Sequence, residues 1–141
     1  MAGSPKVSDE ELHALSEFRC ELRKFLRASE EICKTEGVTT MHYQILLHTH
    51  THRDRTWVHV GELAGRLHSS HHGAVSLVSR AEAAGLVMRK VDPTDRRQVQ
   101  VHATPRGKRL LQRVAVKHRN ELSALYKVFN AIDVVASNPS Q

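Results

Sequence analysis

The sequence contains few aromatic residues and no long apolar run. Phe, Trp and Tyr make up 4% of its 141 residues, and no stretch approaches the roughly 18 uninterrupted apolar residues of a membrane-spanning helix. No hydrophobic targeting segment follows Met1. We therefore expect a cytoplasmic protein whose length suits one domain with a core of its own.

The motifs of common enzymes are absent as well. The sequence holds no glycine-rich phosphate loop, no HExxH motif and no nucleophile elbow. The two cysteines, Cys20 and Cys33, fall in the first predicted helix, where they would lie about 20 Å apart and could not pair. We predict no enzyme and no cofactor, and we interpret the cysteines as packing residues rather than oxidant sensors.

Positive charge is abundant, and it is unevenly placed. The net charge is +6, yet residues 80–119 hold eleven Lys and Arg against three acidic residues, so the rest of the chain is slightly negative. A basic stripe attracts a polyanion and releases its counterions, which is typical of nucleic-acid binding. For Lys108, Arg109, Arg113 and Lys117 a solvated helix face explains the charge equally well.

Two short helices are predicted in the middle of the chain. Val60, Leu63, Ala64 and Leu67 recur at helical spacing, and His59 with Glu62 has the spacing of a capping box. After a break at 68–70, a second helix runs over 71–84 until Gly85 ends it. The pattern is that of a helix-turn-helix.

The second helix has one apolar face and one polar face. Ala74, Leu77, Val78 and Ala81 cluster on one side and are the expected core residues. About 14 residues of helix span about 21 Å and fit lengthwise into a major groove about 12 Å wide. We therefore interpret 71–84 as a recognition helix.

A β-hairpin is predicted directly after this helix. The β-rich runs 86–91 and 98–102 flank a turn at 92–97 that ends in Arg96 and Arg97, a wing whose guanidinium groups suit phosphate or a minor groove. Asp95 is expected to orient one arginine. A short strand at Trp57 and Val58 is expected to pair with the wing. The candidate DNA contacts are Ser69, Ser70, His71, His72, Gly73, Ser76, Ser79, Arg80, Arg89, Arg96 and Arg97.

Several segments stand in a fixed order and spacing. They are VGELA at 60–64, HHxAVxLVxR at 71–80, AAGLV at 83–87, DPxDRRxVxV at 92–101 and TPxG at 104–107. In this combination the chain resembles the MarR family of bacterial transcription regulators over roughly residues 39–125. Three positions depart from that pattern, since the family often carries Arg at Ser76, Asp at Ser79 and Leu at Ala103.

The resemblance implies both an assembly and a function. It implies an obligate homodimer whose first and last helices pair, with a winged domain on each subunit that binds double-stranded DNA at an inverted-repeat operator. It also implies that many members release DNA when a small amphipathic ligand binds near the domain junction, or when a thiol is oxidised. Phe25 and Tyr43 are the candidate ligand contacts on this basis, with ordinary core packing as the alternative.

Both ends of the chain are predicted to form helices that require a partner. Ser8 with Glu11 makes a capping box at the start of the first helix. The apolar stripe on this helix, which includes Leu12, Leu15 and Leu26, is longer than one small domain can cover. Thr104 and Pro105 open the last helix, with a bend expected at 120–121. We expect a mainly α fold with a small β-hairpin wing. Its predicted parts are a tail 1–7, a dimerisation helix 8–37, a winged helix-turn-helix domain 38–103, dimerisation helices 104–137 and a tail 138–141.

Two alternatives to a sequence-specific repressor remain open. The segment 48–59 contains His48, His50, His52 and His59, and imidazole is a common metal ligand, which allows a metal-sensing regulator. On a helix, however, alternate histidines spread apart, and no cysteine or carboxylate stands at tight ligand spacing, so no metal site is predicted. A non-specific architectural DNA-binding protein would use the same positive charge.

Overall fold

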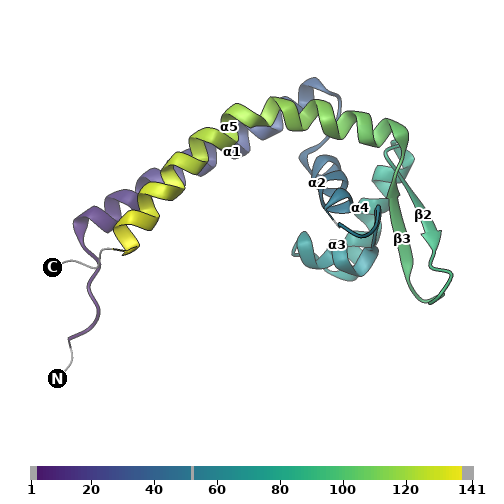
Figure 1. Cartoon of the computed structure of the whole chain (residues 1–141), viewed down its shortest axis with the longest axis horizontal. Helices are drawn as coiled ribbons and strands as arrows, with labels where there is room; N and C mark the ends of the chain where they lie inside the picture. Colours follow the sequence, from purple (N-terminus) through teal and green to yellow (C-terminus); the bar gives the residue numbers. More distant parts are fainter. Residues whose placement is uncertain (1–2, 52, 138–141) are drawn as a thin grey trace. The chain divides into compact units, whose positions relative to one another are not determined.

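The computed structural model describes residues 3–51 and 53–137, and of residues 132–137 the backbone only. The predicted tail 138–141, Met1, Ala2 and His52 lie outside the described residues. The fold is mainly helical with one small antiparallel sheet, as predicted (Figure 1). The elements are α1 (Asp9–Thr35), α2 (Thr40–His50), β1 (Trp57–His59), α3 (Val60–Arg66), α4 (His71–Ala83), β2 (Val87–Val91), β3 (Val99–Ala103) and α5 (Pro105–Ser137).

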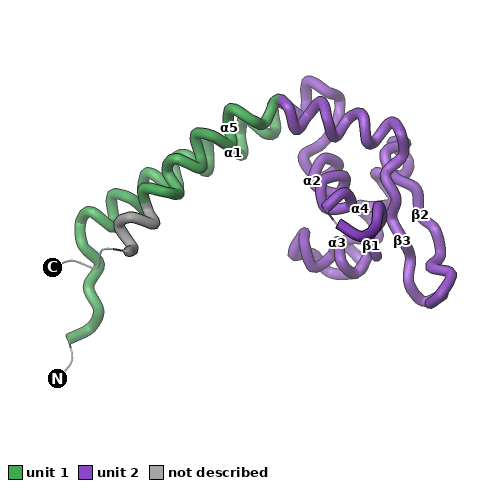
Figure 2. The backbone as a smooth tube through the Cα atoms, viewed as in Figure 1, with its two compact units in different colours: residues 1–31, 117–141 green, residues 32–116 purple. Residues whose placement is uncertain are grey.

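The chain divides into two compact units (Figure 2). Unit 1 consists of residues 1–31 and 117–141, and unit 2 consists of residues 32–116. Unit 2 contains the helix-turn-helix and the wing. None of the described helices is long and apolar enough to cross a membrane.

Local signals begin and end the helices of unit 2. The Ser70 hydroxyl accepts a hydrogen bond from the Gly73 N–H at 3.0 Å and caps α4. After α4 the chain turns at Gly85, whose φ of +76° is readily adopted only by glycine. The predicted span 71–84 is therefore confirmed within one residue. The turn between α3 and α4 contains His68, a non-glycine residue at φ +51°.

The three strands form one sheet in the order β1-β3-β2, with both pairs antiparallel. Val101 in the central strand β3 pairs with Val58 of β1 on one side and with Arg89 of β2 on the other. The short first strand therefore pairs with the wing, as predicted. Val58, Val87 and Val101 are buried, because alternate residues of each strand face the helices.

A close approach joins α5 to the wing. The Thr104 hydroxyl accepts from the Gly107 N–H at 3.0 Å and donates to the Gly85 carbonyl at 2.7 Å. A Cβ at Gly107 would lie 2.1 Å from the Leu86 carbonyl oxygen, so only glycine fits there. Thr104 and Gly107 therefore fix how the last helix leaves the sheet, a role that the sequence analysis did not predict.

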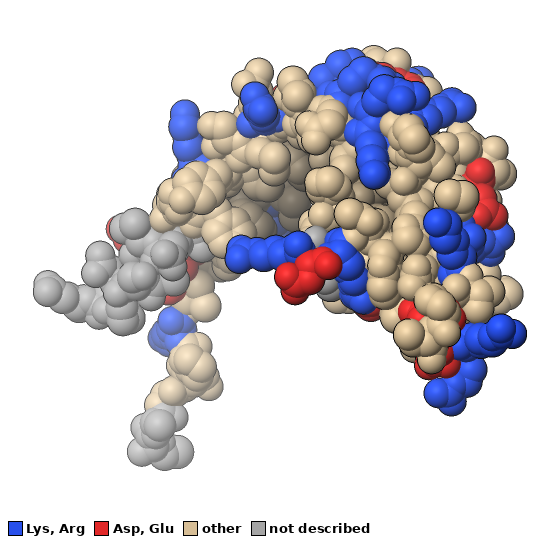
Figure 3. Space-filling view, turned by 45° about the vertical axis from the view of Figure 1, so that its right-hand side comes forward, with Lys and Arg blue, Asp and Glu red and all other residues tan. Residues whose placement is uncertain are grey.

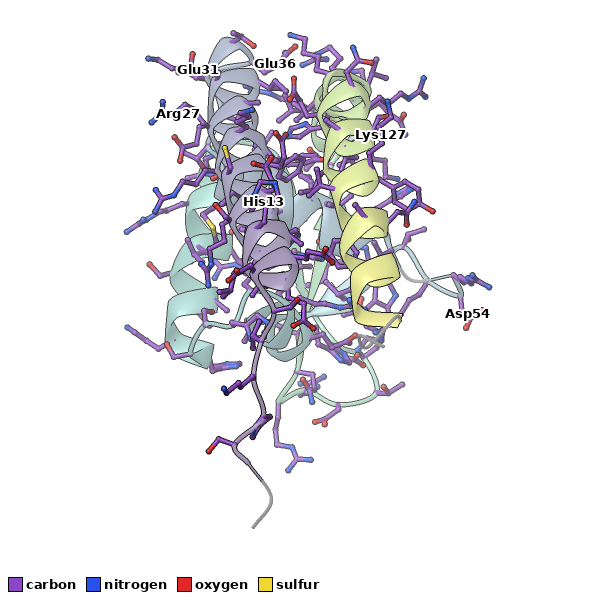
Figure 4. The ribbon with its side chains drawn as sticks, turned by 90° about the vertical axis from the view of Figure 1, so that its left-hand side faces the viewer. His13, Arg27, Glu31, Glu36, Asp54 and Lys127 are labelled. Atoms are coloured by element: carbon purple, nitrogen blue, oxygen red, sulfur yellow. The ribbon has the colours of Figure 1, made fainter. Side chains whose placement is uncertain are left out.

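Within unit 1, α1 and α5 run side by side, and Figure 4 shows their side chains with His13 on α1 and Lys127 on α5. The predicted capping box is present, since the Ser8 N–H donates to Glu11 Oε2 at 2.7 Å and the Glu11 N–H donates to Ser8 Oγ at 3.2 Å. The expected bend at 120–121 is wrong. Helix α5 runs from Pro105 to Ser137 without a break, because Asn120 and Glu121 cost a helix little when they stay at the surface.

Candidate nucleic-acid interface

The polar side of α4 lies at the surface of unit 2. His71, His72, Ser76 and Arg80 are exposed, whereas Ala74, Val78 and Ala81 are fully buried beneath them. Leu77, also expected in the core, is half-buried. The exposed face carries short or hydrogen-bonding side chains, which lets the helix backbone approach the bases of a groove closely.

The first turn of α4 is tightly built. Ser69 and Gly73 are half-buried, Ser70 is exposed, and a Cβ at Gly73 would lie 3.1 Å from the capping Ser70 oxygen. Free backbone N–H groups at a helix N-terminus favour anions such as phosphate. Ser70 uses its hydroxyl as the cap, so its predicted role in DNA contact is joined to a structural one.

Two predicted DNA contacts are engaged with each other in the structure. The Arg89 guanidinium donates to Ser79 Oγ at 3.1 Å and to Glu82 Oε1 at 3.0 Å from its Nη2. Glu82 also accepts from the Arg89 backbone N–H at 2.8 Å, and these bonds lower the pKa of the Glu82 carboxyl. Arg89, Ser79 and Glu82 therefore tie β2 to α4, a link that the sequence did not predict because the partners lie on separate elements.

The tip of the wing exposes arginines. Asp95 accepts from the Arg97 side chain at 3.1 Å and from the Arg97 backbone N–H, so the predicted orienting role of Asp95 is confirmed. The Arg97 side chain is nevertheless 91% exposed, and Arg96 is exposed beside it. In Figure 3, Lys and Arg side chains gather at the end of the wing next to acidic ones. An exposed, oriented guanidinium suits a phosphate or a minor groove.

A cavity of about 90 Å³ lies between the start of α4 and the wing, with residues of the candidate interface in its wall. His71, Arg89 and Arg97 all line it, together with apolar side chains that include Val60 and Val75. The structure thus brings together one predicted contact from the recognition helix, one from β2 and one from the wing tip.

A buried polar cluster at the base of the wing was not predicted. Asp92, interpreted from sequence as a turn residue, is 4% exposed and lies 2.7 Å from the His59 Nε2 atom. Its hydrogen bonds to His59, Thr94 and Gln100 hold the pKa of the Asp92 carboxyl well below its usual range. The sequence Asp-Pro-Thr-Asp at 92–95 was the available signal, because an aspartate side chain often accepts hydrogen bonds from the backbone of its own turn.

His59 occupies the position before α3, as predicted. Its backbone N–H donates to Glu62 Oε1 at 3.2 Å, and its side chain accepts from the Glu62 backbone N–H, so the expected capping box is present. The Nε2 atom of the same imidazole ring contacts Asp92.

The histidine-rich segment does not form a metal site in the part of the chain that the structure describes. No group of three or more His, Cys, Asp or Glu side chains lies close enough there to hold a metal ion. His48 and His50 end α2, and His52 lies outside the described residues. Burial and the nearby Arg66 charge lower the pKa of His48.

The candidate ligand contacts lie in different units. Phe25 belongs to unit 1, where its ring meets the His118 ring edge-on at 6.1 Å. Tyr43 belongs to unit 2, packs against its core, and has its pKa raised by burial. A shared ligand site at these two residues stays a prediction.

The two cysteines differ in environment. Cys33 is 1% exposed within the core of unit 2, and burial raises the pKa of its thiol. Cys20 is exposed on α1 in unit 1. A raised pKa makes a thiol less reactive, which agrees with a packing role for Cys33.

Comparison with known proteins finds similarity to the MarR family. The model of the MarR family matches residues 36–98. An uncharacterized HTH-type transcriptional regulator of Bacillus subtilis, YsmB, is 34% identical over 70 residues, which are 50% of this chain and 48% of that protein. The chain is thus matched over about half the length of this relative.

Solved structures of similar fold include two from Streptomyces coelicolor. AbsC, a MarR family transcriptional regulator, matches with a TM-score of 0.72 and 21% identity over 96% of this chain and 91% of its own. Sco3205, a MarR family regulator solved in complex with DNA, matches with a TM-score of 0.73 and 19% identity over 98% of this chain and 92% of its own. The helix-turn-helix lies wholly within residues 36–98, which are similar to the MarR family.

Proposed function

We propose that this chain is a dimeric, sequence-specific DNA-binding regulator of transcription that acts as a repressor. Helix α4 enters the major groove, and the wing contacts the backbone or the minor groove. The observation that carries the proposal is the pairing of an exposed polar face on α4 with an exposed, oriented Arg97 at the wing tip. The DNA-bound structure of Sco3205 supports it by similarity of fold.

The proposed dimer follows from unit 1. Leu12, Leu15 and Leu26 on α1 and Leu122, Tyr126 and Phe129 on α5 are each about half exposed or more in the single chain. If a second copy covers this apolar surface, its removal from water stabilises the dimer. Two copies related by a two-fold axis would bind half-sites about one helical turn, roughly 34 Å, apart. A small amphipathic ligand would release the DNA.

Selection of bound duplexes from a random-sequence pool tests the function directly. Enrichment of an inverted repeat supports a symmetric, sequence-specific reader. Binding without enrichment would instead identify a non-specific architectural DNA-binding protein, and no binding would contradict the proposal.

The wing is tested by Arg97→Ala, which should weaken DNA binding and reduce the slope of log affinity against log salt by about one. Arg23→Ala on α1 removes the same charge from an exposed site outside both the wing and the basic stretch 80–119, and serves as the control. An unchanged slope for Arg97→Ala would show that the wing does not contact phosphate.

A further inference from the structure

The small cavity between the start of α4 and the wing has two arginines and no carboxylate in its wall. It encloses about 90 Å³, and its polar lining consists of Arg89, Arg97, His71 and Gln98. The rest of the wall is Gly61 and three valines, and no Asp or Glu is among the described residues that line it. A guanidinium is always charged, and an apolar wall reduces the screening of that charge by water. The cavity therefore suits one small anionic group.

The Arg89 guanidinium is held by residues that lie outside the cavity wall. Its Nε and Nη2 atoms donate to Glu82 Oε1 at 3.3 and 3.0 Å, and its Nη1 atom donates to Ser79 Oγ at 3.1 Å. The Arg89 backbone N–H donates to Glu82 Oε2 at 2.8 Å. Neither Glu82 nor Ser79 lines the cavity. These bonds fix the orientation of the guanidinium and leave some of its N–H groups for a further acceptor.

The Arg97 guanidinium is held in the same manner. Its Nε atom donates to Asp95 Oδ1 at 3.1 Å, and its Nη2 atom donates to Asp95 Oδ2 at 3.5 Å. Asp95 does not line the cavity either. These two bonds do not use the Nη1 atom of Arg97, so its N–H groups remain for another acceptor. Each arginine is thus oriented by one carboxylate outside the cavity, while both guanidinium groups border the same small space.

We propose that this cavity binds one phosphate group of the DNA backbone, which Arg89 and Arg97 hold jointly. Glu82 and Asp95 are then positioning residues, each of which orients one of the two arginines. Guanidinium groups donate paired hydrogen bonds to phosphate oxygens, and an arginine that is already oriented loses less side-chain entropy on binding. One phosphate fills a space of this size, so both arginines bind the same group. The proposal rests on the proposed function and names the DNA group that this part of the interface binds.

The first experiment asks whether the two arginines act together. The affinity of the whole protein for a labelled mixed-sequence duplex of about 30 base pairs, long enough for two half-sites, is measured for Arg89→Ala, Arg97→Ala and the double variant. Each single change should weaken binding by about tenfold. The loss in the double variant should be at least about threefold smaller than the product of the two single losses, because groups that share a partner are not additive.

Arg23→Ala on α1, at an exposed site, removes the same charge and should change the affinity much less. Losses at Arg89 and Arg97 that multiply would mean that the two arginines act independently, which overturns the proposal. Binding by Arg89→Ala that equals the wild type overturns it as well.

The second experiment locates the phosphate on the DNA. In the duplex that the random-pool selection enriches, one phosphate at a time is replaced by an uncharged methylphosphonate. At one position in each half-site the replacement should weaken wild-type binding by about tenfold. At that position Arg89→Ala and Arg97→Ala should cost little further affinity, since their common partner has lost its charge. If the two arginines lose their effects at two different positions, they bind separate phosphates and the shared site is wrong.

The positioning role of Glu82 is tested by the sign of its effect. Glu82→Gln removes a negative charge, which by electrostatics alone should strengthen DNA binding slightly. If Glu82 orients Arg89, the change should instead weaken binding by about three- to fivefold, and it should cost nothing in the Arg89→Ala background. Glu30→Gln, at an exposed site of unit 1, is the control for the lost charge. Stronger binding by Glu82→Gln, or an equal cost with and without Arg89, overturns the positioning role.

Failure of the phosphate site differs from failure of the proposed function. If the wild type binds no DNA, both the proposed function and the phosphate site are wrong. If the wild type binds DNA and an inverted repeat is enriched, while the losses at Arg89 and Arg97 multiply, the proposed function stands and the shared phosphate site alone is overturned.

Discussion

The two units of this chain differ in how far they bury their apolar residues. Among the described side chains, every buried hydrophobic residue lies in unit 2, between Cys33 and Val114. Ser29 and His118 are the buried residues of unit 1 within that same description, and they form a polar pair with 2.8 Å between the Ser29 oxygen and His118 Nε2. Unit 2 has therefore closed a core with its own residues, whereas unit 1 has not.

The difference follows from the shapes of the two units. Unit 2 packs short helices on several sides of a small sheet, so each element finds apolar neighbours on more than one side. Unit 1 consists of two long helices side by side, which can bury only the stripe where they face each other. The remaining apolar side chains of unit 1 are therefore the ones to which we assign the proposed dimer surface.

The largest expected effect comes from breaking the core of unit 2. Gly107→Ala would place a Cβ 2.1 Å from the Leu86 carbonyl oxygen, and backbone cannot yield as a side-chain end can. We expect the free energy of unfolding to fall by about 3 kcal/mol, measured by denaturant unfolding. Gly65→Ala in α3, where a Cβ meets nothing within 4 Å, should instead gain about 0.5–1 kcal/mol. Equal responses at the two glycines would contradict this account.

A second test exchanges an apolar for a charged residue in each unit. Leu15 on α1 is 51% exposed and Met88 on β2 is 45% exposed in the single chain. Leu15→Glu should weaken dimer formation by about 2 kcal/mol, since the charge would be buried twice in a symmetric interface. Met88→Glu should change association and stability by less than about 0.5 kcal/mol. Sedimentation equilibrium measures the association of both variants, and denaturant unfolding measures their stability. If Leu15→Glu associates as strongly as the wild type, the distinction between the two units is wrong.

The buried carboxylate of unit 2 should make its stability depend on pH. Because the folded-state pKa of Asp92 is lowered, chiefly by its hydrogen bond with His59, its stabilising contribution is full above the unfolded-state pKa of about 4 and is lost as the pH falls below that value. Asp92→Asn should therefore cost stability at about pH 7 and much less at about pH 3, as measured by denaturant unfolding. Asp54→Asn, at an exposed site of the same unit, is the control. A cost for Asp92→Asn that is the same at both pH values would rule out this linkage.

The smallest effect is expected at the turn between α3 and α4. His68 is held at φ +51°, where a side chain is strained. His68→Gly should raise the free energy of unfolding by about 0.5–1 kcal/mol, seen as a small rise in the thermal midpoint. A fall would mean that the imidazole makes contacts that outweigh the strain.

Elements marked by local chemistry were predictable from the sequence. The Ser8 and Glu11 capping box and the stop at Gly85 were located correctly, since each depends on residues only a few positions apart. The hairpin and its arginine-bearing turn were found for the same reason. The bend expected at 120–121 was wrong, because polar residues permit a helix end without requiring one.

The exposed residues of the candidate site could be predicted from the sequence, whereas the hydrogen bonds that join its elements could not. The sequence located the polar face of α4 and the two wing arginines, because helical and strand periodicity sorts residues by face. It did not predict that Arg89 is engaged by Glu82 and Ser79, seven and ten residues away. Those partners come from separate elements, so no spacing rule connects them.

The sequence by itself determined which segments form helices, strands and turns, where the positive charge gathers, and which face of α4 is polar. Those properties depend on side-chain chemistry within a few residues of each position. Only the tertiary structure decided that Asp92 is buried, that His59 meets it across 33 positions, and that unit 2 holds the whole buried apolar core of the described chain. Such contacts depend on how the elements pack together, and packing brings distant residues into reach of one another.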